Sequence, residues 1–283
     1  MADSSRVLIT GATSGIGRAT AVRLAADGHK VIASGRREEA LGKLAGEAGV
    51  ATLLLDVTSS DSLAQAGERL DRITEGHGVD VLINNAGFGR LAPMEHVTDE
   101  DLRQQFETNV FGLVRLSQLV LPRMRKRGAG KIINVSSLVG RVTIPMQGIY
   151  CASKHAVESL SDAWRVEAAA FGVRVVLVEP GAIDTNFAPT ALAHKEDYRA
   201  RDPRYGPALD SYQKVLGKMY KRAPGPERVA RTIVRIVRKR RPRARYVVPW
   251  YNRFAVFFYR ITPTRWVDAI MGRVLGLRRK PSD

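Results

Sequence analysis

The sequence predicts an α/β protein: a doubly wound, parallel sheet in a single domain, followed by a helical C-terminal extension. Short runs rich in Val, Ile and Leu recur along the chain, as expected of strands that are buried on both faces. The segments between these runs carry apolar residues at helical spacing, for example Ile16, Ala19 and Val22. Alternating strands and helices of this kind form a parallel sheet that binds ligands outside the carboxyl ends of its strands.

Seven apolar runs are assigned as strands: Arg6–Thr10, Lys30–Ser34, Ala51–Asp56, Asp80–Ile83, Lys131–Ser136, Val173–Glu179 and Arg245–Pro249. Between Ala182 and Pro226 the pattern loses its regularity. Long irregular stretches inside a compact domain usually cover or line a binding site. We therefore expect residues 182–226 to form the substrate loop of a domain that spans residues 1–249.

A glycine-rich turn follows the first strand and opens a helix. It reads T-G-A-T-S-G-I-G, and its candidate binding residues are Gly11, Ser14, Gly15, Ile16 and Gly17. Glycines allow a tight turn that approaches a pyrophosphate closely, and the helix N-terminus offers unpaired N–H groups. This turn between a strand and a helix predicts a Rossmann-like site for a dinucleotide.

The end of the second strand indicates which dinucleotide binds. An NAD-specific site holds an acid there for the ribose 2′-hydroxyl, but this chain continues with Arg36 and Arg37. Guanidinium groups pair well with a 2′-phosphate. We therefore predict NADP(H) rather than NAD(H).

Tyr150 and Lys154 are four residues apart, so on a helix their side chains share a face. Reduction of a carbonyl needs a proton donor beside the developing alkoxide, and an unperturbed phenol has a pKa of about 10. A nearby ammonium lowers the pKa of a phenol toward the working range. The pair is thus suited to acid–base work on an alcohol or a carbonyl compound.

Together with Asn84–Gly87, Asn109 and Ser136-Ser137, these motifs closely resemble the short-chain dehydrogenase/reductase family, in its Y-x-x-x-K subgroup. The resemblance covers roughly Arg6 to Thr185 and points to hydroxysteroid and retinol dehydrogenase-like members. It implies a catalytic set of Asn109, Ser137, Tyr150 and Lys154. Ser137, 13 residues before Tyr150, would hold the substrate oxygen, and Asn109 would anchor a water.

The resemblance also implies cofactor contacts beyond the glycine-rich turn. In the family, the lysine that corresponds to Lys154 hydrogen-bonds the nicotinamide ribose as well. The remaining positions are the adenine-side Asp56 and Val57, the segment Asn85, Ala86 and Gly87, and the nicotinamide-side Pro180, Gly181, Ile183 and Thr185. Family members commonly form homodimers or homotetramers, although the C-terminal extension could block one interface here.

The sequence leaves the substrate open. Phe187, Tyr198, Tyr205 and Tyr212 could line an apolar pocket or pack on the surface. The long extension resembles that of members acting on bulky apolar substrates such as steroids, retinoids or lipids. A 3-oxoacyl-type reductase and a non-catalytic NADP-sensing regulator remain as alternatives.

The chain has one cysteine, Cys151, which excludes an internal disulfide and a cysteine-rich metal site, and we assign no metal ligand. No signal peptide precedes the first strand, and no uncharged apolar run approaches the roughly 20 residues of a spanning helix. We therefore expect a cytoplasmic protein, attached at most to the inner face of a membrane.

The net charge of +17 is concentrated at the C-terminal end, where residues 221–283 hold 18 Lys and Arg against three acids. We see no nucleic-acid recognition fold around these residues, which disfavours that partner. In residues 250–283, apolar and basic residues alternate at helical spacing. The apolar set is Trp250, Tyr251, Phe254, Phe257, Phe258, Ile261, Trp266, Ile270, Val274 and Leu277; the basic set is Arg253, Arg260, Arg265, Arg273, Arg278, Arg279 and Lys280. Such helices lie on anionic membranes or pack on protein, and periodicity does not separate the two.

Overall fold

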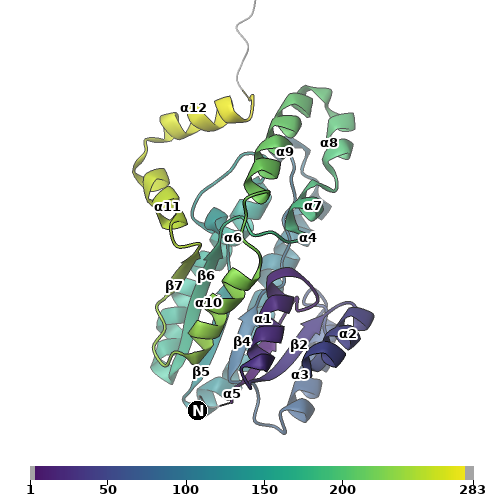
Figure 1. Ribbon diagram of the computed structural model, residues 1–283, viewed down its shortest axis with the longest axis vertical. Coiled ribbons are helices and arrows are strands. Elements are labelled where there is room, and N and C mark those ends of the chain that lie inside the picture. The colour runs from purple at the N-terminus through teal and green to yellow at the C-terminus, as the bar shows by residue number, and fades with distance from the viewer. Residues whose placement is uncertain (1–3, 278–283) are drawn as a thin grey trace, which may run out of the picture.

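Seven parallel strands form the central sheet, in the order β3-β2-β1-β4-β5-β6-β7 (Figure 1). The strands are β1 (Arg6–Ile9), β2 (Lys30–Gly35), β3 (Ala51–Leu54), β4 (Val81–Asn84), β5 (Gly130–Val135), β6 (Val173–Pro180) and β7 (Arg245–Val248). The computed structural model describes residues 4–277. All seven predicted strands are confirmed, with ends that differ by one or two residues, and the doubly wound parallel sheet is confirmed with them.

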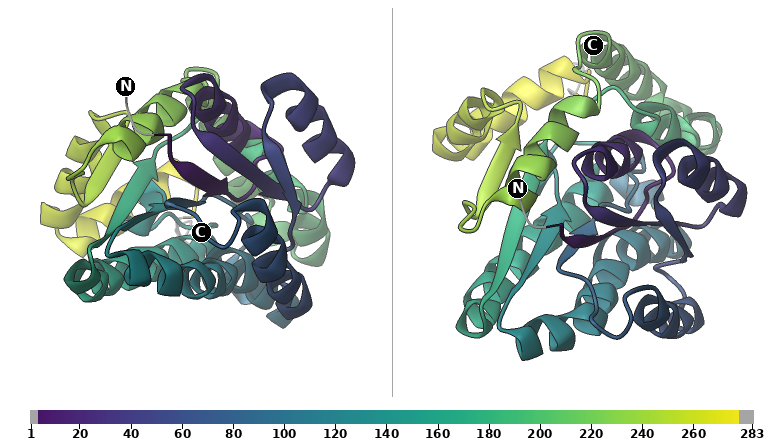
Figure 2. Two further views of the ribbon diagram at one scale, coloured as in Figure 1. Left: turned by 90° about the horizontal axis from the view of Figure 1, so that it is seen from below. Right: turned by 60° about the horizontal axis from the view of Figure 1, so that its bottom comes forward.

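Helices cover both faces of the sheet, which Figure 2 shows end-on as three layers. One face packs on α1 (Gly15–Ala26), α2 (Glu38–Ala48) and α10 (Glu227–Arg238), and the other packs on α3 (Ser60–Ile73), α5 (Gly112–Arg127) and α6 (Gly148–Glu167). Strand residues alternate between the two cores. Val7 and Ile9 of β1 join the first, whereas Leu8 joins the second. This two-sided burial explains why the strands are apolar without interruption.

Strand order reverses between β1 and β4, since β2 continues on one side of β1 and β5 on the other side of β4. Ligands of doubly wound sheets bind at this position, outside the carboxyl ends of the strands. The connections that leave these ends are the glycine-rich turn before α1, the segment after β4 and the short helix η3 (Leu138–Gly140) after β5. Between β4 and α5 the chain forms η1 (Met94–His96), α4 (Asp99–Phe106) and the π-helical turn η2 (Glu107–Phe111).

Most of residues 182–226 are helical rather than irregular, and their role as the substrate loop stays a prediction. Residues 187–220, which we call the cap segment, form α7 (Phe187–Leu192), α8 (Lys195–Arg201), η5 (Pro203–Tyr205) and α9 (Gly206–Tyr220). The first two helices have only six and seven residues, too few to establish a helical period. In α9, Pro207 stands in the first turn, and Leu209, Tyr212 and Leu216 are buried at helical spacing.

Two helices, α11 (Asn252–Ile261) and α12 (Thr264–Val274), follow β7 and extend along the side of the molecule toward α9 (Figure 1). Most of their large apolar side chains are exposed, whereas Val256 and Leu275 are buried. Within residues 4–277, no helix combines the length and the hydropathy needed to cross a membrane. Arg278, Arg279 and Lys280 of the predicted basic set lie outside the described residues.

Candidate active site

A cleft of about 1210 Å³ lies at the carboxyl ends of the strands. Most of the site residues predicted from the sequence line this cleft, although they come from connections far apart in the chain. The lining set is Gly11, Ser14, Gly15, Ile16, Arg36, Arg37, Asp56, Val57, Asn85, Ala86, Gly87, Ser137, Tyr150, Lys154, Pro180, Gly181, Ile183 and Thr185. Gly17 and Asn109 are absent from the lining and lie behind it.

The glycine-rich turn fits a dinucleotide. Gly11 and Gly15 have φ angles of 64° and 51°, which favour glycine. A Cβ on Gly17 would lie 2.2 Å from the carbonyl oxygen of Gly11, so the helix can approach the turn only without a side chain there. Ser14 caps α1 without a side-chain hydrogen bond, and the first turn contains no acid. The first amide groups of α1 are therefore suited to an anion such as a pyrophosphate.

Thr10 joins this turn to the segment after β4. Its hydroxyl accepts hydrogen bonds from the amides of Asn85 (3.0 Å) and Ala86 (2.9 Å). The Asn85 side-chain amide also donates a hydrogen bond, to the Thr10 carbonyl at 2.9 Å. Thr10 belongs to the glycine-rich motif in the sequence. Its role in joining the two connections was not visible there, because it depends on a contact with Asn85, 75 positions away.

Arg36 and Arg37 are exposed at the edge of the cleft where β2 ends. The Arg37 guanidinium donates to the Thr13 hydroxyl at 3.1 Å, which holds it beside the glycine-rich turn. Farther along the cleft, Asp56 accepts from the amide and the hydroxyl of Thr58, at 2.9 and 2.8 Å. The two arginines therefore form the cationic end of the cofactor side.

Tyr150 and Ser137 face each other across the middle of the cleft. Tyr150 is buried in the first turns of α6, and Ser137 caps η3 just after β5. Burial raises the pKa of Tyr150, while the hydrogen bond with Ser137 lowers it. The phenol consequently stays protonated at neutral pH and can donate a proton. We expected Lys154 to lower this pKa, but burial of the ring is the largest influence on it and raises it instead.

Lys154 lies one helical turn after Tyr150, with its Nζ 6.0 Å from the centre of the Tyr150 ring. Nζ donates to the carbonyl of Val135, the last residue of β5, at 2.9 Å. Burial lowers the pKa of Lys154 to about 8, and the Glu158 carboxylate acts in the opposite direction. The lysine is therefore held at the floor of the cleft, with a pKa of about 8.

Asn109 lies in the π-helical turn between α4 and α5, behind the cleft wall. Its amide donates to the Phe88 carbonyl (2.9 Å) and the Ser153 hydroxyl (3.0 Å), and its oxygen accepts from the Phe88 amide (3.1 Å). A Cβ on Gly87 would lie 3.1 Å from that oxygen and 3.5 Å from the Lys154 Nζ. Asn109 thus fixes the segment after β4 near Lys154, and its expected water contact stays a prediction.

The other half of the cleft is largely apolar and is covered by the cap segment. Its residues are Val139, Val142, Ile144, Phe187, Tyr212, Leu216 and Met219. The Phe187 ring lies 5.2 Å from the Tyr150 ring. Sequence reasoning singled out Phe187 and Tyr212 but missed the aliphatic residues, since nothing in their type or spacing sets them apart from core residues.

Tyr198 and Tyr205 do not line the cleft. Tyr198 is buried and donates to Asp101 at 2.9 Å, which joins α8 to α4. Tyr205 donates to Glu95 in η1. Both tyrosines therefore attach the cap segment to the body of the protein.

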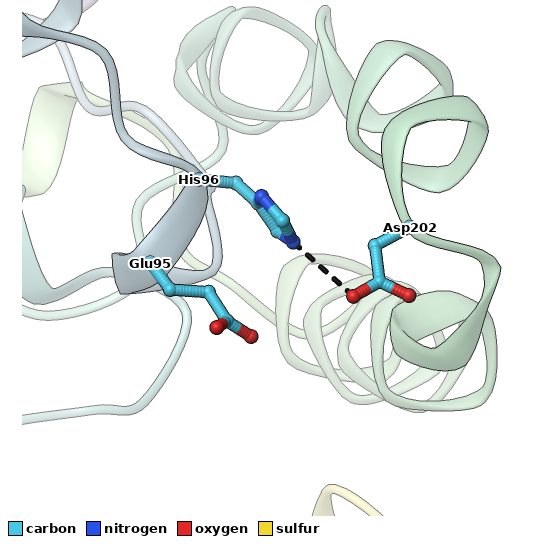
Figure 3. A group of neighbouring side chains, drawn as sticks. All are labelled: Glu95, His96 and Asp202. Carbon is cyan, nitrogen blue, oxygen red and sulfur yellow. Dashed lines mark hydrogen bonds and ion pairs between the residues drawn. The ribbon is translucent and has the colours of Figure 1, made fainter.

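One group of potential metal ligands occurs within residues 4–277, at this same attachment (Figure 3). His96 Nε2 lies 3.3 Å from Asp202 Oδ2, and Glu95 lies beside them. The Arg204 guanidinium already binds both oxygens of Asp202, with Nε to Oδ1 at 2.9 Å and Nη2 to Oδ2 at 2.7 Å. A cation would have to displace that guanidinium, so we interpret the group as part of the contact between η1 and η5.

Comparison with known proteins agrees with this geometry. The short chain dehydrogenase family matches residues 5–196. The 3-ketodihydrosphingosine reductase of Bacteroides thetaiotaomicron is 39% identical over 83% of this chain and 84% of its own. The human 17-beta-hydroxysteroid dehydrogenase type 1 is 38% identical over 85% of this chain and 76% of its own. A solved structure of a serine dehydrogenase with NADP+ superposes with a TM-score of 0.73 at 28% identity, covering 86% of this chain and 93% of that one.

The comparisons, the sheet order and the position of Tyr150, Lys154 and the glycine-rich turn around one cleft agree on the class of protein. The chain belongs to the short-chain dehydrogenase/reductase family and is an oxidoreductase that interconverts alcohols and carbonyl compounds with a nicotinamide cofactor.

Proposed function

We propose that the protein is an NADP(H)-dependent reductase of a bulky, apolar ketone or aldehyde, and that it oxidises the corresponding alcohol in the reverse direction. One observation carries the proposal: Tyr150, Ser137 and Lys154 lie where a polar, glycine-lined half of the cleft meets an apolar half. A cofactor in the first half and a substrate in the second would meet at the Tyr150 hydroxyl.

The chain's own groups account for the proton side of this reaction. A bound NADPH would be the source of the hydride that the carbonyl carbon accepts. The hydroxyls of Ser137 and Tyr150 hold the carbonyl oxygen, and Tyr150 donates its proton to that oxygen as the C–O double bond becomes single. The Lys154 ammonium stabilises the phenolate that remains, until a proton from solvent restores the phenol. The carbonyl compound gains one hydride and one proton and so becomes the alcohol, while the cofactor is oxidised to NADP+, so atoms and charge balance.

Two observations support NADP(H) over NAD(H). The cationic end of the cofactor side holds Arg36 and Arg37 and lacks the acid that would bind a ribose 2′-hydroxyl. A guanidinium can pair with a 2′-phosphate through two hydrogen bonds. The serine dehydrogenase of the same fold was solved with NADP+.

The apolar half of the cleft supports a bulky, uncharged substrate. The seven side chains named for this half are uncharged, and its only polar group among them is the Tyr212 hydroxyl. Two relatives carry the names of enzymes for apolar ketones or alcohols, one a long-chain sphingoid ketone and the other a steroid. We therefore favour a lipid-like, steroid or retinoid substrate.

An activity panel tests this proposal. NADPH consumption would be followed with a long-chain 3-ketosphingoid base, a 17-ketosteroid, retinal and a 3-oxoacyl thioester, each with NADH in parallel. We expect turnover with at least one apolar ketone or aldehyde and a clear preference for NADPH. Preferred turnover of the thioester would instead establish a 3-oxoacyl-type reductase. NADPH binding without turnover of any compound would establish a cofactor-sensing protein.

A further inference from the structure

The α11–α12 segment carries large apolar side chains that nothing in the described chain covers. Trp250, Tyr251, Phe254, Phe257, Phe258, Ile261, Trp266, Ile270 and Val274 are each between 48% and 59% exposed. In α12, Trp266, Ile270 and Val274 stand four residues apart and share one face, and Phe254 and Phe258 do so in α11. Monomeric proteins rarely expose an aromatic patch of this extent without a partner.

The segment is attached to the protein by residues outside this apolar set, one in the middle of α11 and one just after α12. Val256 and Leu275 are buried, and Leu275 packs in the cluster that contains Tyr212 and Leu216. The Tyr259 hydroxyl accepts a hydrogen bond from the Thr143 amide at 3.2 Å. The sequence left open that the aromatic face packs on protein, either on the sheet or on another subunit. The exposure of its side chains excludes packing on the sheet and leaves another subunit as the alternative to a membrane.

The charge of the segment identifies the kind of partner. Between Trp250 and Leu277 the chain has four exposed arginines against one acid, Asp268. The Arg253 guanidinium lies 5.1 Å from the Trp250 ring and 5.2 Å from the Phe254 ring, so cationic and aromatic groups share one surface. Aromatic residues flanked by arginines are typical of helices that lie in the interface of an anionic membrane.

A second copy of the chain fits this surface less well. A two-fold contact through the aromatic face would bring together the same patch from both copies. Arg253 and Arg260 of one copy would then lie close to the arginines of the other copy. Each copy has one acid in this segment, Asp268, to offset their positive charge. Like charges placed together at an interface oppose association.

The same segment borders the substrate side of the cleft. Thr143, which Tyr259 contacts, lies between Val142 and Ile144, and both of these line the cleft. Tyr212 and Leu216, which pack with Leu275, line it as well. A membrane that binds the aromatic face would therefore lie close to the apolar half of the cleft.

We propose that α11 and α12 form a docking surface for an anionic lipid membrane and hold the substrate side of the cleft next to it. Membrane docking does not depend on the proposed function. The benefit of docking, uptake of an apolar substrate from the lipid, does rest on the proposed function. The aromatic face would enter the interface while the arginines contact the lipid phosphates and carboxylates.

Vesicle flotation with the full chain tests the docking without any turnover. We expect binding to vesicles of phosphatidylcholine with phosphatidylserine, and much weaker binding to phosphatidylcholine alone or in high salt. Replacing Arg253 and Arg260 by Gln should weaken binding to the anionic vesicles roughly fivefold for each arginine. The double variant Phe254→Ser/Phe258→Ser should abolish it and retain the native circular dichroism, because both rings are exposed. Phe171→Ser is the matched control, since Phe171 is 47% exposed on a different surface.

Tryptophan fluorescence locates the contact. The chain has three tryptophans, of which Trp250 and Trp266 lie in the proposed surface and Trp164 lies in α6. Vesicles with brominated acyl chains should quench the Trp164→Phe protein strongly and the Trp250→Phe/Trp266→Phe protein little. The proposal is overturned if the wild type does not float with anionic vesicles, or if Phe171→Ser loses binding equally. It is also overturned if the Phe254→Ser/Phe258→Ser variant dissociates a dimer and leaves vesicle binding unchanged.

Discussion

The Nζ of Lys154 donates to the backbone carbonyl of Val135 at 2.9 Å, so the sheet itself sets the position of the lysine in the cleft. Val135 ends β5, and Ser137 follows two residues later as the cap of η3. The strand that places Ser137 therefore also places Lys154, and α6 adds Tyr150 one turn earlier. The relative positions of the three groups depend on the junction of β5 and α6.

The pH dependence of ketone reduction should follow the protonation state of Lys154. Burial lowers the pKa of Lys154 to about 8, so the side chain is charged below that pH and neutral above it. If the ammonium stabilises the Tyr150 phenolate, kcat/KM for reduction is high below pH 8 and falls as pH rises through that value. The Lys154→Met variant should be at least about a hundredfold slower and should lack this descending limb. An unchanged limb in the variant would assign the titration to another group.

Cofactor preference should depend on Arg36 and Arg37. Replacing both with Ala should lower kcat/KM for NADPH by roughly 10- to 100-fold, because one or two charge-assisted hydrogen bonds to the 2′-phosphate are lost. The kcat/KM for NADH should change little. Arg23→Ala is the control, since Arg23 is exposed on α1 and does not line the cleft. Equal losses with both cofactors would show that the two arginines do not contact a 2′-phosphate.

Dinucleotide binding should be abolished by Gly17→Ala. The new Cβ would lie 2.2 Å from the Gly11 carbonyl oxygen, so α1 has to move away from the turn that approaches the pyrophosphate. Gly42→Ala in α2 is the matched control, because nothing lies within 4 Å of its Cβ position. That variant should bind NADPH normally and gain up to about 1 kcal/mol of stability from its helix propensity. Calorimetric titration with NADPH measures the binding of both variants. Normal NADPH binding by Gly17→Ala would contradict the predicted role of the glycine-rich turn.

Lys131 should contribute to stability rather than to catalysis. Its Nζ donates to the carbonyls of Ile236, Val237 and Lys239 at the end of α10, at 2.8, 2.7 and 2.9 Å. Lys131→Met removes these three hydrogen bonds, although the Ile236 carbonyl keeps the Lys239 amide at 3.2 Å. The substitution should lower the free energy of unfolding by about 2–3 kcal/mol. Lys30→Met, at an exposed position on β2, should change it by less than about 0.5 kcal/mol. Urea unfolding measures both, and similar values for the two variants would refute the assigned role.

The sequence predicted the fold well, because strands of a parallel sheet are apolar on both faces. Val7, Leu8 and Ile9 supply both cores at once and therefore form an uninterrupted run. The cap segment was not predicted as helical, since α7 and α8 are too short for their periodicity to be distinguished from a loop. In α11 and α12 the helical spacing was visible, but only the structure indicates that the aromatic face is uncovered.

The two halves of the cleft differ in how far the sequence can predict them. The glycine-rich turn and the pair of Tyr150 and Lys154 carry their chemistry in residue type and local spacing. Val142 and Leu216 do not, because an aliphatic side chain that lines a cleft has the same type and spacing as one in a core. Their position in the site depends on contacts between η3, α6 and the cap segment.

The most direct test of the central claim compares the wild type with Tyr150→Phe, using NADPH and an apolar ketone that the wild type reduces. Both proteins should bind NADPH equally, because the phenyl ring keeps its packing against Phe187. The variant has no phenolic proton to donate, so its kcat should be about a hundredfold or more below that of the wild type. NADPH consumption by Tyr150→Phe at a rate within a few fold of the wild type would contradict Tyr150 as the proton donor, and with it the proposed mechanism.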